Sequence, residues 1–209
     1  MSNQLLTLIS FDMKKIWMVA VATNLVFFVK AQDSEIETQA IGVVIDAHAL
    51  VDVVSDEIVF DFSADDPTEA GSPFVLGTNK KQSTDLNYSL MLSNGGLADG
   101  TISVHIDNMN EGMYISLLAD GTSAASLDPN KFGRLGTVNA LFDATAGGPS
   151  VKLTSTDQVL IENIGSSYTG NGAGNGYQLF YTAHIDNYAL LDADNGAQDM
   201  GTITYTIAE

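Results

Sequence analysis

The chain has 209 residues, with 26 acidic against eight basic side chains, a formal net charge of −18 and no cysteine. The charge argues against nucleic acid as a partner, because phosphate binding needs a basic surface, and the missing cysteines exclude disulfides, thiolate metal sites and cysteine nucleophiles. The apolar fraction of 45% is ordinary for a folded domain, so we expect a packed core and not a disordered acidic chain.

The first 31 residues have the order of a secretory signal peptide. Two lysines precede a mostly apolar run of 14 residues, 16–29, and a small residue, Ala31, follows shortly after it. The run is shorter than the roughly 20 apolar residues that a membrane-spanning helix needs. We expect cleavage between Ala31 and Gln32, with an uncleaved anchor as the alternative, and Met13 is an alternative start. The mature protein would then have no membrane span and would be secreted, to the outside or to the surface of a bacterial cell.

Residues 32–209 are expected to form one domain. The signal holds three of the eight basic residues and one of the 26 acids, so this part carries five basic and 25 acidic side chains, and it has no tryptophan. No interior segment shows a shift in composition that would mark a linker. A chain of this length fits a single large β domain.

Alternation of apolar and polar residues predicts about ten strands in this domain. The clearest runs are 41–53, 58–62, 86–92, 102–106, 113–117, 177–185 and 203–207, with shorter candidates at 138–142, 151–153 and 159–161. Between them lie clusters of Gly, Asn, Asp and Pro, which are typical of tight turns. The pattern predicts an all-β fold, a two-sheet antiparallel β-sandwich that is immunoglobulin-like or jelly-roll-like, with a barrel as the alternative.

Each of the three histidines has an aspartate two residues away. The pairs are Asp46 with His48, His105 with Asp107, and His184 with Asp186. Residues i and i+2 share one face of a strand, so each pair can meet side by side. Such pairs suit a metal site or a general base, but they also suit the solvated face of an acidic protein.

An acidic segment near the C-terminus is the best candidate for a metal site. Asp192, Asp194 and Asp199 surround a glycine turn, and carboxylate oxygens are the ligands that calcium takes. The segment is not an EF-hand loop, because its glycine and closing residue do not match that motif. We therefore expect no cofactor, with calcium as the alternative.

A glycine-rich loop is the most unusual local feature. Residues 165–176 contain five glycines and lie between two expected strands. The loop is not a phosphate loop, since no lysine follows and no helix begins there. Its candidate ligand-contacting residues, for example toward a carbohydrate, are Ser167, Tyr168, Asn171 and Asn175. The alternative is a long hairpin connection.

Catalysis is not expected from the sequence. There is no G-x-S-x-G nucleophile elbow, and no other constellation fills the roles that an active site requires. We expect a protein that is not an enzyme.

The two ends of the mature chain suggest assembly. The first strand, 41–53, is unusually long, and the last, 203–207, lies next to the C-terminus. Terminal strands can pair with a neighbouring molecule by β-strand addition.

At its two termini the chain resembles the secreted pilin subunits of the chaperone/usher kind, with Gly196 as the fourteenth residue from the end. It departs from that pattern because Tyr205 is not penultimate, Asp199 and Met200 interrupt the final alternation, and there is no cysteine pair. The resemblance implies an incomplete sandwich completed by a strand of the next subunit.

From these observations we expect a secreted, non-catalytic structural or adhesive subunit of the cell surface. Its expected partner is a second copy of itself or another surface protein, through residues 41–53 and 201–207. The alternative function is a secreted module that binds calcium or carbohydrate.

Overall fold

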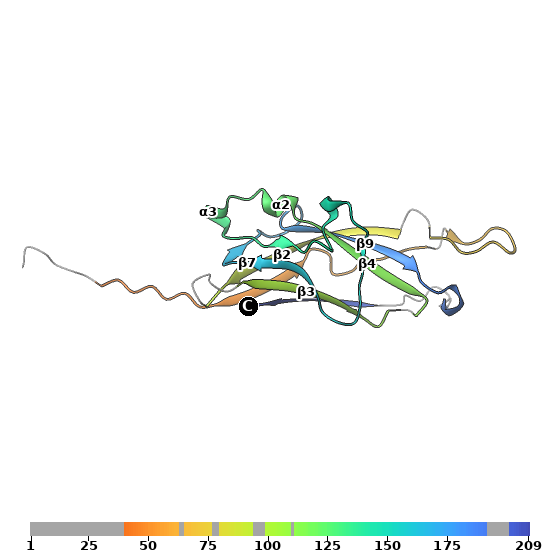
Figure 1. Ribbon diagram of the computed structural model, residues 1–209, viewed down its shortest axis with the longest axis horizontal. Coiled ribbons are helices and arrows are strands. Elements are labelled where there is room, and N and C mark those ends of the chain that lie inside the picture. Colours follow the sequence, from red (N-terminus) through yellow and green to blue (C-terminus); the bar gives the residue numbers. More distant parts are fainter. Residues whose placement is uncertain (1–39, 63–64, 77–79, 94–98, 110, 192–200) are drawn as a thin grey trace, which may run out of the picture. The chain divides into compact units, whose positions relative to one another are not determined.

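The computed structural model describes residues 40–62, 65–76, 80–93, 99–109, 111–191 and 201–209. The chain separates into two compact units, residues 1–44 and 45–209. Of the first unit only residues 40–44 are described, and they form neither helix nor strand. The second unit contains the helices and strands that follow (Figure 1).

The larger sheet has six strands. Its main path is β1-β2-β9-β4-β6, and β8 pairs with β2 off this path. All of these pairings are antiparallel. The strands are β1 (His48–Val53), β2 (Lys81–Met91), β4 (Met113–Asp120), β6 (Val151–Lys152), β8 (Ser167–Tyr168) and β9 (Tyr177–Ile185).

The smaller sheet has four strands in the order β10-β3-β7-β5, again all antiparallel. They are β3 (Gly100–Asp107), β5 (Thr137–Val138), β7 (Gln158–Ile164) and β10 (Thr202–Ala208). The register between β3 and β7 shifts near Ile102. In β7, Asn163 has a positive φ of 62°, and the adjacent Leu160 and Ile161 are both buried, as expected where a bulge interrupts the alternation.

The core lies between the two sheets. Every second residue of the central strands is buried there: Leu86, Tyr88 and Leu90 of β2, Tyr177, Leu179, Tyr181 and Ala183 of β9, Ile115, Leu117 and Ala119 of β4, and Ile102, Val104 and Ile106 of β3. One apolar face on each sheet can be buried only against the other. The predicted two-sheet β-sandwich is therefore confirmed.

Short helical turns connect the strands. They are α2 (Thr122–Ala125), α3 (Pro129–Phe132) and the 3₁₀ turns η3 (Ala144–Ala146) and η4 (Tyr188–Leu190). At the start of α3, the Asp128 side chain accepts a hydrogen bond from the backbone N–H of Asn130, and Pro129 follows it, an arrangement typical of a helix N-terminus. At η3, hydrogen bonds from Thr145 lower the pKa of Asp143 below its usual value.

Three predicted strands are wrong in extent or existence. The candidate 138–142 is strand only at Val138, the last residue of β5. The first strand was expected over residues 41–53, but β1 begins only at His48. Its partner explains this, since His48 lies opposite Met91, the last residue of β2, so earlier residues have no β2 residue to pair with. The run 58–62 is not a strand, although Ile58, Phe60 and Phe62 pack against the core as the alternation suggested.

Candidate functional site

The segment just before β1 is apolar and exposed. Residues 41–47, called the overhang below, precede β1 and continue its alternation of apolar and polar residues in the sequence. In β1 the half-buried Val51 and Val53 define the inward phase, and the same phase contains Ile41, Val43 and Ile45. These three side chains are 84%, 78% and 69% exposed, whereas such residues are normally buried.

The two edge strands β1 and β10 belong to different sheets and lie side by side. Within the described part of the chain, each is hydrogen-bonded on one side only, β1 to β2 and β10 to β3. A slot of about 210 Å³, lined by Val51, Asp52, Val53 and Tyr205, opens between them. We call this slot and the free edge of β10 the seam.

The apolar side chains at the seam are only partly covered. Ile203, Tyr205 and Ile207 occupy the inward phase of β10 but are half-buried, in contrast to the fully buried residues on the neighbouring strand β3. A further strand at this edge would cover them. The geometry of the seam therefore suits a β-strand as its ligand.

A pair of tyrosines forms the floor of the seam. The hydroxyls of Tyr181 and Tyr205 are 2.6 Å apart and hydrogen-bonded to each other. Burial raises the pKa of Tyr181 to about 12, and the hydrogen bond to Tyr205 offsets part of that rise. Burial and the neighbouring Tyr181 raise the pKa of Tyr205 well above its usual value. Both phenols are therefore neutral at any physiological pH.

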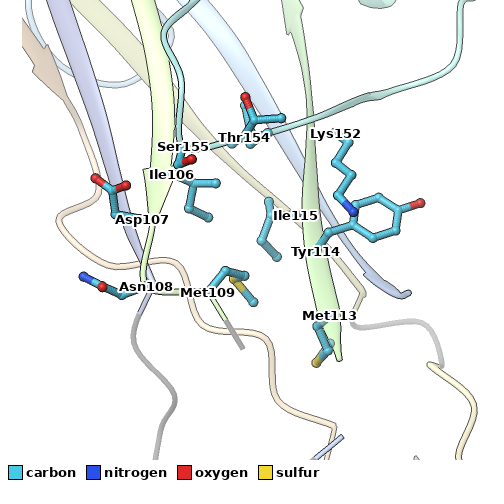
Figure 2. Close-up of a pocket in the computed structure, with 11 residues that line it drawn as sticks. Ile106, Asp107, Asn108, Met109, Met113, Tyr114, Ile115, Lys152, Thr154 and Ser155 are labelled. Carbon is cyan, nitrogen blue, oxygen red and sulfur yellow. The ribbon is translucent and has the colours of Figure 1, made fainter. Parts of the chain in front are cut away.

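A second opening lies between the sheets where β3 ends and β4 begins. This pocket of about 240 Å³ is lined by Ile106, Met109, Met113 and Ile115 among others. Figure 2 shows Ile106 and Ile115 pointing toward one another from the two strands, with Lys152 and Tyr114 on the other side of β4. The pocket is the uncovered end of the core, and it brings together none of the residues predicted as ligand contacts.

The glycine-rich loop is fastened to β2. Ser167 and Tyr168 form β8, with Ser167 buried and Tyr168 exposed against the ring of Phe132 at 5.0 Å. The hydroxyl of Ser167 donates to the Gly165 carbonyl, so this candidate residue serves the fold. The Asn175 side chain donates to the Asn171 carbonyl at 2.9 Å.

Beneath the loop, on β2, lies one buried polar atom without a partner in the described structure, Oδ1 of Asn87. The amide nitrogen of this side chain donates to the Gly172 carbonyl at 3.2 Å, and the Asp85 carboxylate accepts from the Gly174 N–H at 3.0 Å. These contacts hold the loop on the outer face of β2. Of the predicted contacts, only Tyr168 and Asn171 have exposed side chains.

The three histidines have separate surroundings. His105 lies between Asp107 (3.3 Å) and Asp157 (2.7 Å), so its predicted pairing with Asp107 is confirmed. His48 contacts Ser89 Oγ at 3.2 Å and, more distantly, the Asp46 carbonyl rather than its carboxylate.

His184 does not pair with Asp186 in the structure. It stacks on Tyr114 at 4.5 Å and is hydrogen-bonded to Ser116 Oγ at 2.7 Å, while Asp186 binds Lys152 at 2.6 Å. Burial lowers the pKa of His184, and the positive charge of Lys80 lowers it further. The ring is therefore neutral at neutral pH.

Some predicted residues lie outside the described part of the chain. These are the cleavage residues Ala31 and Gln32 and the acidic candidates Asp192, Asp194 and Asp199. Among the residues that are described, no group of three or more His, Asp or Glu side chains is arranged to hold a metal ion. Within the same residues, no helix has the length and apolar character needed to cross a membrane.

Comparisons with known proteins give no guide to the function, which is therefore argued from the chain's own geometry. No protein-family model, curated protein or solved structure matches the chain. The resemblance of its termini to pilin subunits stays a prediction.

Alternation in the sequence did not reveal the seam as a site. In the sequence, Tyr205 has the same inward position in its run as Tyr88, Tyr177 and Tyr181, which are 4%, 0% and 2% exposed. Alternation shows which face of a strand is apolar, but it does not show whether a neighbouring strand covers that face. The position of β10 at a sheet edge supplies this information.

Proposed function

We propose that the protein is an exported, non-catalytic structural or adhesive subunit of the bacterial cell surface that assembles by β-strand addition. The observation that carries this proposal is the overhang, whose apolar residues are exposed and keep the alternation of β1 in the sequence. The signal sequence supports export, and the likeness of both termini to pilin subunits supports assembly.

The overhang has the properties of a donor strand. Ile41, Val43 and Ile45 present one apolar face at a period of two, and full burial of a side chain of this kind is worth roughly 1.5–3 kcal/mol. The β-branched residues also favour the extended conformation. Burying these side chains in a second molecule therefore provides a driving force for association.

The seam has the properties of an acceptor. The free edge of β10 can offer main-chain hydrogen bonds, and the half-buried Ile203, Tyr205 and Ile207 can receive alternate side chains of an added strand. This division of labour, with affinity from the main chain and specificity from side-chain pockets, is the general mode of β-strand addition. One overhang per seam gives a head-to-tail contact, which extends into a chain of subunits unless it closes into a ring.

The test compares aspartate substitutions at inward and at outward positions of the overhang. The expected mature chain, residues 32–209, is measured by light scattering over a range of concentrations and inspected by electron microscopy. We expect polymers for the natural sequence and a monomer for Val43→Asp combined with Ile45→Asp, because a charge in the inward phase cannot enter the seam.

Val44→Asp is the matched control. It introduces the same charge into the same exposed segment, but on the outward phase, so polymers should still form. A natural chain that stays monomeric at every concentration would contradict the proposal, as would equal assembly of the inward and outward variants.

A further inference from the structure

The few basic residues of the mature chain are concentrated at one end of the larger sheet. Of the five in residues 32–209, Lys80, Lys81 and Lys152 lie there, while Lys131 and Arg134 lie in and after α3. In a chain with 25 acids over the same residues, this is the one place in the described structure where three lysines gather.

Strand register places two of these lysines in one row. Lys81 lies opposite Thr182, Thr182 opposite Ser116, and Ser116 opposite Lys152. Residues directly opposite one another in antiparallel strands project from the same face. Since the neighbouring residues Tyr181 and Leu117 point into the core, the row faces outward. We call Lys81, Thr182, Ser116 and Lys152 the basic row.

The surroundings of the basic row hold the lysine at one end in place. Lys152 Nζ lies 4.6 Å from the centroid of the Tyr114 ring and 2.6 Å from Asp186. Tyr114 is itself stacked on His184, and Ser116 Oγ contacts both His184 and Ser150. Thr182 and Ser116 are buried between the two lysines, which leaves a low polar floor with a lysine at each end, Lys152 being paired with Asp186.

We propose that the basic row binds the acidic leader, residues 32–39, of a second copy of the chain. This inference rests on the proposed function and names the second contact that the donor molecule makes. The leader carries Asp33, Glu35 and Glu37 immediately before the overhang. It therefore comes to a neighbouring molecule together with the overhang.

The spacing of the charges matches. In an extended chain Asp33, Glu35 and Glu37 lie on one face, and the first and last of them are roughly 14 Å apart at about 3.4 Å per residue. Lys81 and Lys152 are separated by three strand-to-strand steps, which is also roughly 14 Å at about 4.8 Å per step. A leader crossing the strands can thus place a carboxylate near each lysine.

The position of the basic row also fixes the direction of the added strand. The Thr154 carbonyl, two residues after Lys152, accepts the Ile106 N–H, and the next residue, Asp107, lies opposite Thr202 at the start of β10. The basic row is therefore at the Thr202 end of β10. A leader bound there requires the overhang to run parallel to β10, with its own N-terminal end near Thr202.

The first experiment measures binding of the leader separately from assembly. A fluorescent peptide of residues 32–40 is titrated into the chain of residues 32–209 that carries Val43→Asp and Ile45→Asp, and anisotropy is recorded. We expect saturable binding that weakens about tenfold or more when Lys81→Glu and Lys152→Glu are added, because like charges then face each other. Lys131→Glu with Arg134→Glu, the control that changes the net charge by the same amount away from the basic row, should leave binding unchanged.

The second experiment uses charge reversal in the assembling chain. Glu35→Lys with Glu37→Lys lowers the net negative charge but should weaken assembly, because it brings lysines to the basic row. Mixing this variant with the Lys81→Glu, Lys152→Glu variant should restore assembly. As a control, Glu57→Lys with Glu69→Lys changes the net charge equally at exposed positions and should not weaken assembly.

The outcomes separate this inference from the proposed function. Polymers that form equally well with Glu35→Lys and Glu37→Lys, or a peptide that binds the Lys81→Glu, Lys152→Glu chain as tightly as the natural one, would overturn the role of the basic row and leave strand addition intact. Strand addition itself is tested separately, by whether the chain with Val43→Asp and Ile45→Asp fails to form polymers.

Discussion

At the scale of single residues, the Tyr181–Tyr205 pair links the two sheets at the seam. Tyr181 belongs to β9 of the larger sheet and Tyr205 to β10 of the smaller one, and their hydroxyls share one hydrogen bond of 2.6 Å. Because both pKa values are raised, the folded chain keeps protons that the unfolded chain releases near pH 10. The contribution of the raised pKa values to the free energy of unfolding is thus fully present below about pH 10.

The pair predicts a loss of stability at alkaline pH. As pH rises from about 10 toward about 12, the unfolded state loses the phenolic protons first, so the free energy of unfolding falls. Tyr205→Phe should cost about 1 kcal/mol at pH 8, where it removes a hydrogen bond, and should make the alkaline fall shallower. Urea unfolding at pH 8 and pH 11 checks this, with the exposed Tyr168→Phe as the control. An unchanged alkaline slope in Tyr205→Phe would contradict the role of the pair.

At the scale of elements, alternation located most strands because it reflects a physical requirement of the fold. In β3, Ile102, Val104 and Ile106 are buried as their spacing predicted. The first five residues of β2, Lys81 to Asp85, are all polar, so alternation did not predict them as strand. They are strand because they pair with β9. The two-residue β8 is too short to show any period.

The extent of β1 and the basic row could not be predicted for a related reason. Where β1 begins depends on where β2 ends, which is a property of two segments far apart in sequence. The basic row depends on the register of four strands, and no local pattern joins Lys81 to Lys152. Likewise, the predicted pairing of His184 with Asp186 is lost because Tyr114 and Lys152, from other strands, bind them instead.

The glycine-rich loop provides a prediction at this scale. Gly176 has φ of +71°, and a Cβ atom there would lie 2.2 Å from the Leu86 carbonyl oxygen, whereas Gly172, with φ of +85°, has open space around it. Gly172→Ala should cost about 1–2 kcal/mol from backbone strain alone. Gly176→Ala should cost about 3 kcal/mol or more, since a clash is added to the strain.

Thermal or urea unfolding of the two alanine variants measures the difference directly. Equal stability of Gly172→Ala and Gly176→Ala would show that the loop does not pack on β2 as described.

At the scale of the whole molecule, the chain combines an exposed apolar overhang, an edge with half-covered side chains and an acidic leader whose charge is opposite to that of the basic row. In the proposed assembly, each of these features is incomplete in one copy and is completed by another. The strong negative charge of the remaining surface keeps molecules apart except where these features meet. The proposal therefore predicts that the specificity of assembly comes from both apolar and charged complementarity.

The most direct measurement is cross-linking between an overhang and a seam, for which the cysteine-free sequence provides a clean background. One chain of residues 32–209 carries Val44→Cys on the outward phase, and a second carries Thr204→Cys or Thr206→Cys on the outward phase of β10. Opposite residues of paired strands have Cβ atoms roughly 4.5–5.5 Å apart, which is close enough for a disulfide after a small adjustment.

We predict that mild oxidation of the mixed chains yields a mixed disulfide dimer at one of the two β10 positions. Thr137→Cys on β5, at the opposite edge of the smaller sheet, is the control and should give none. Cross-linking that is equally efficient at β5 and β10, or absent at both β10 positions in samples that polymerise, would contradict strand addition at the seam.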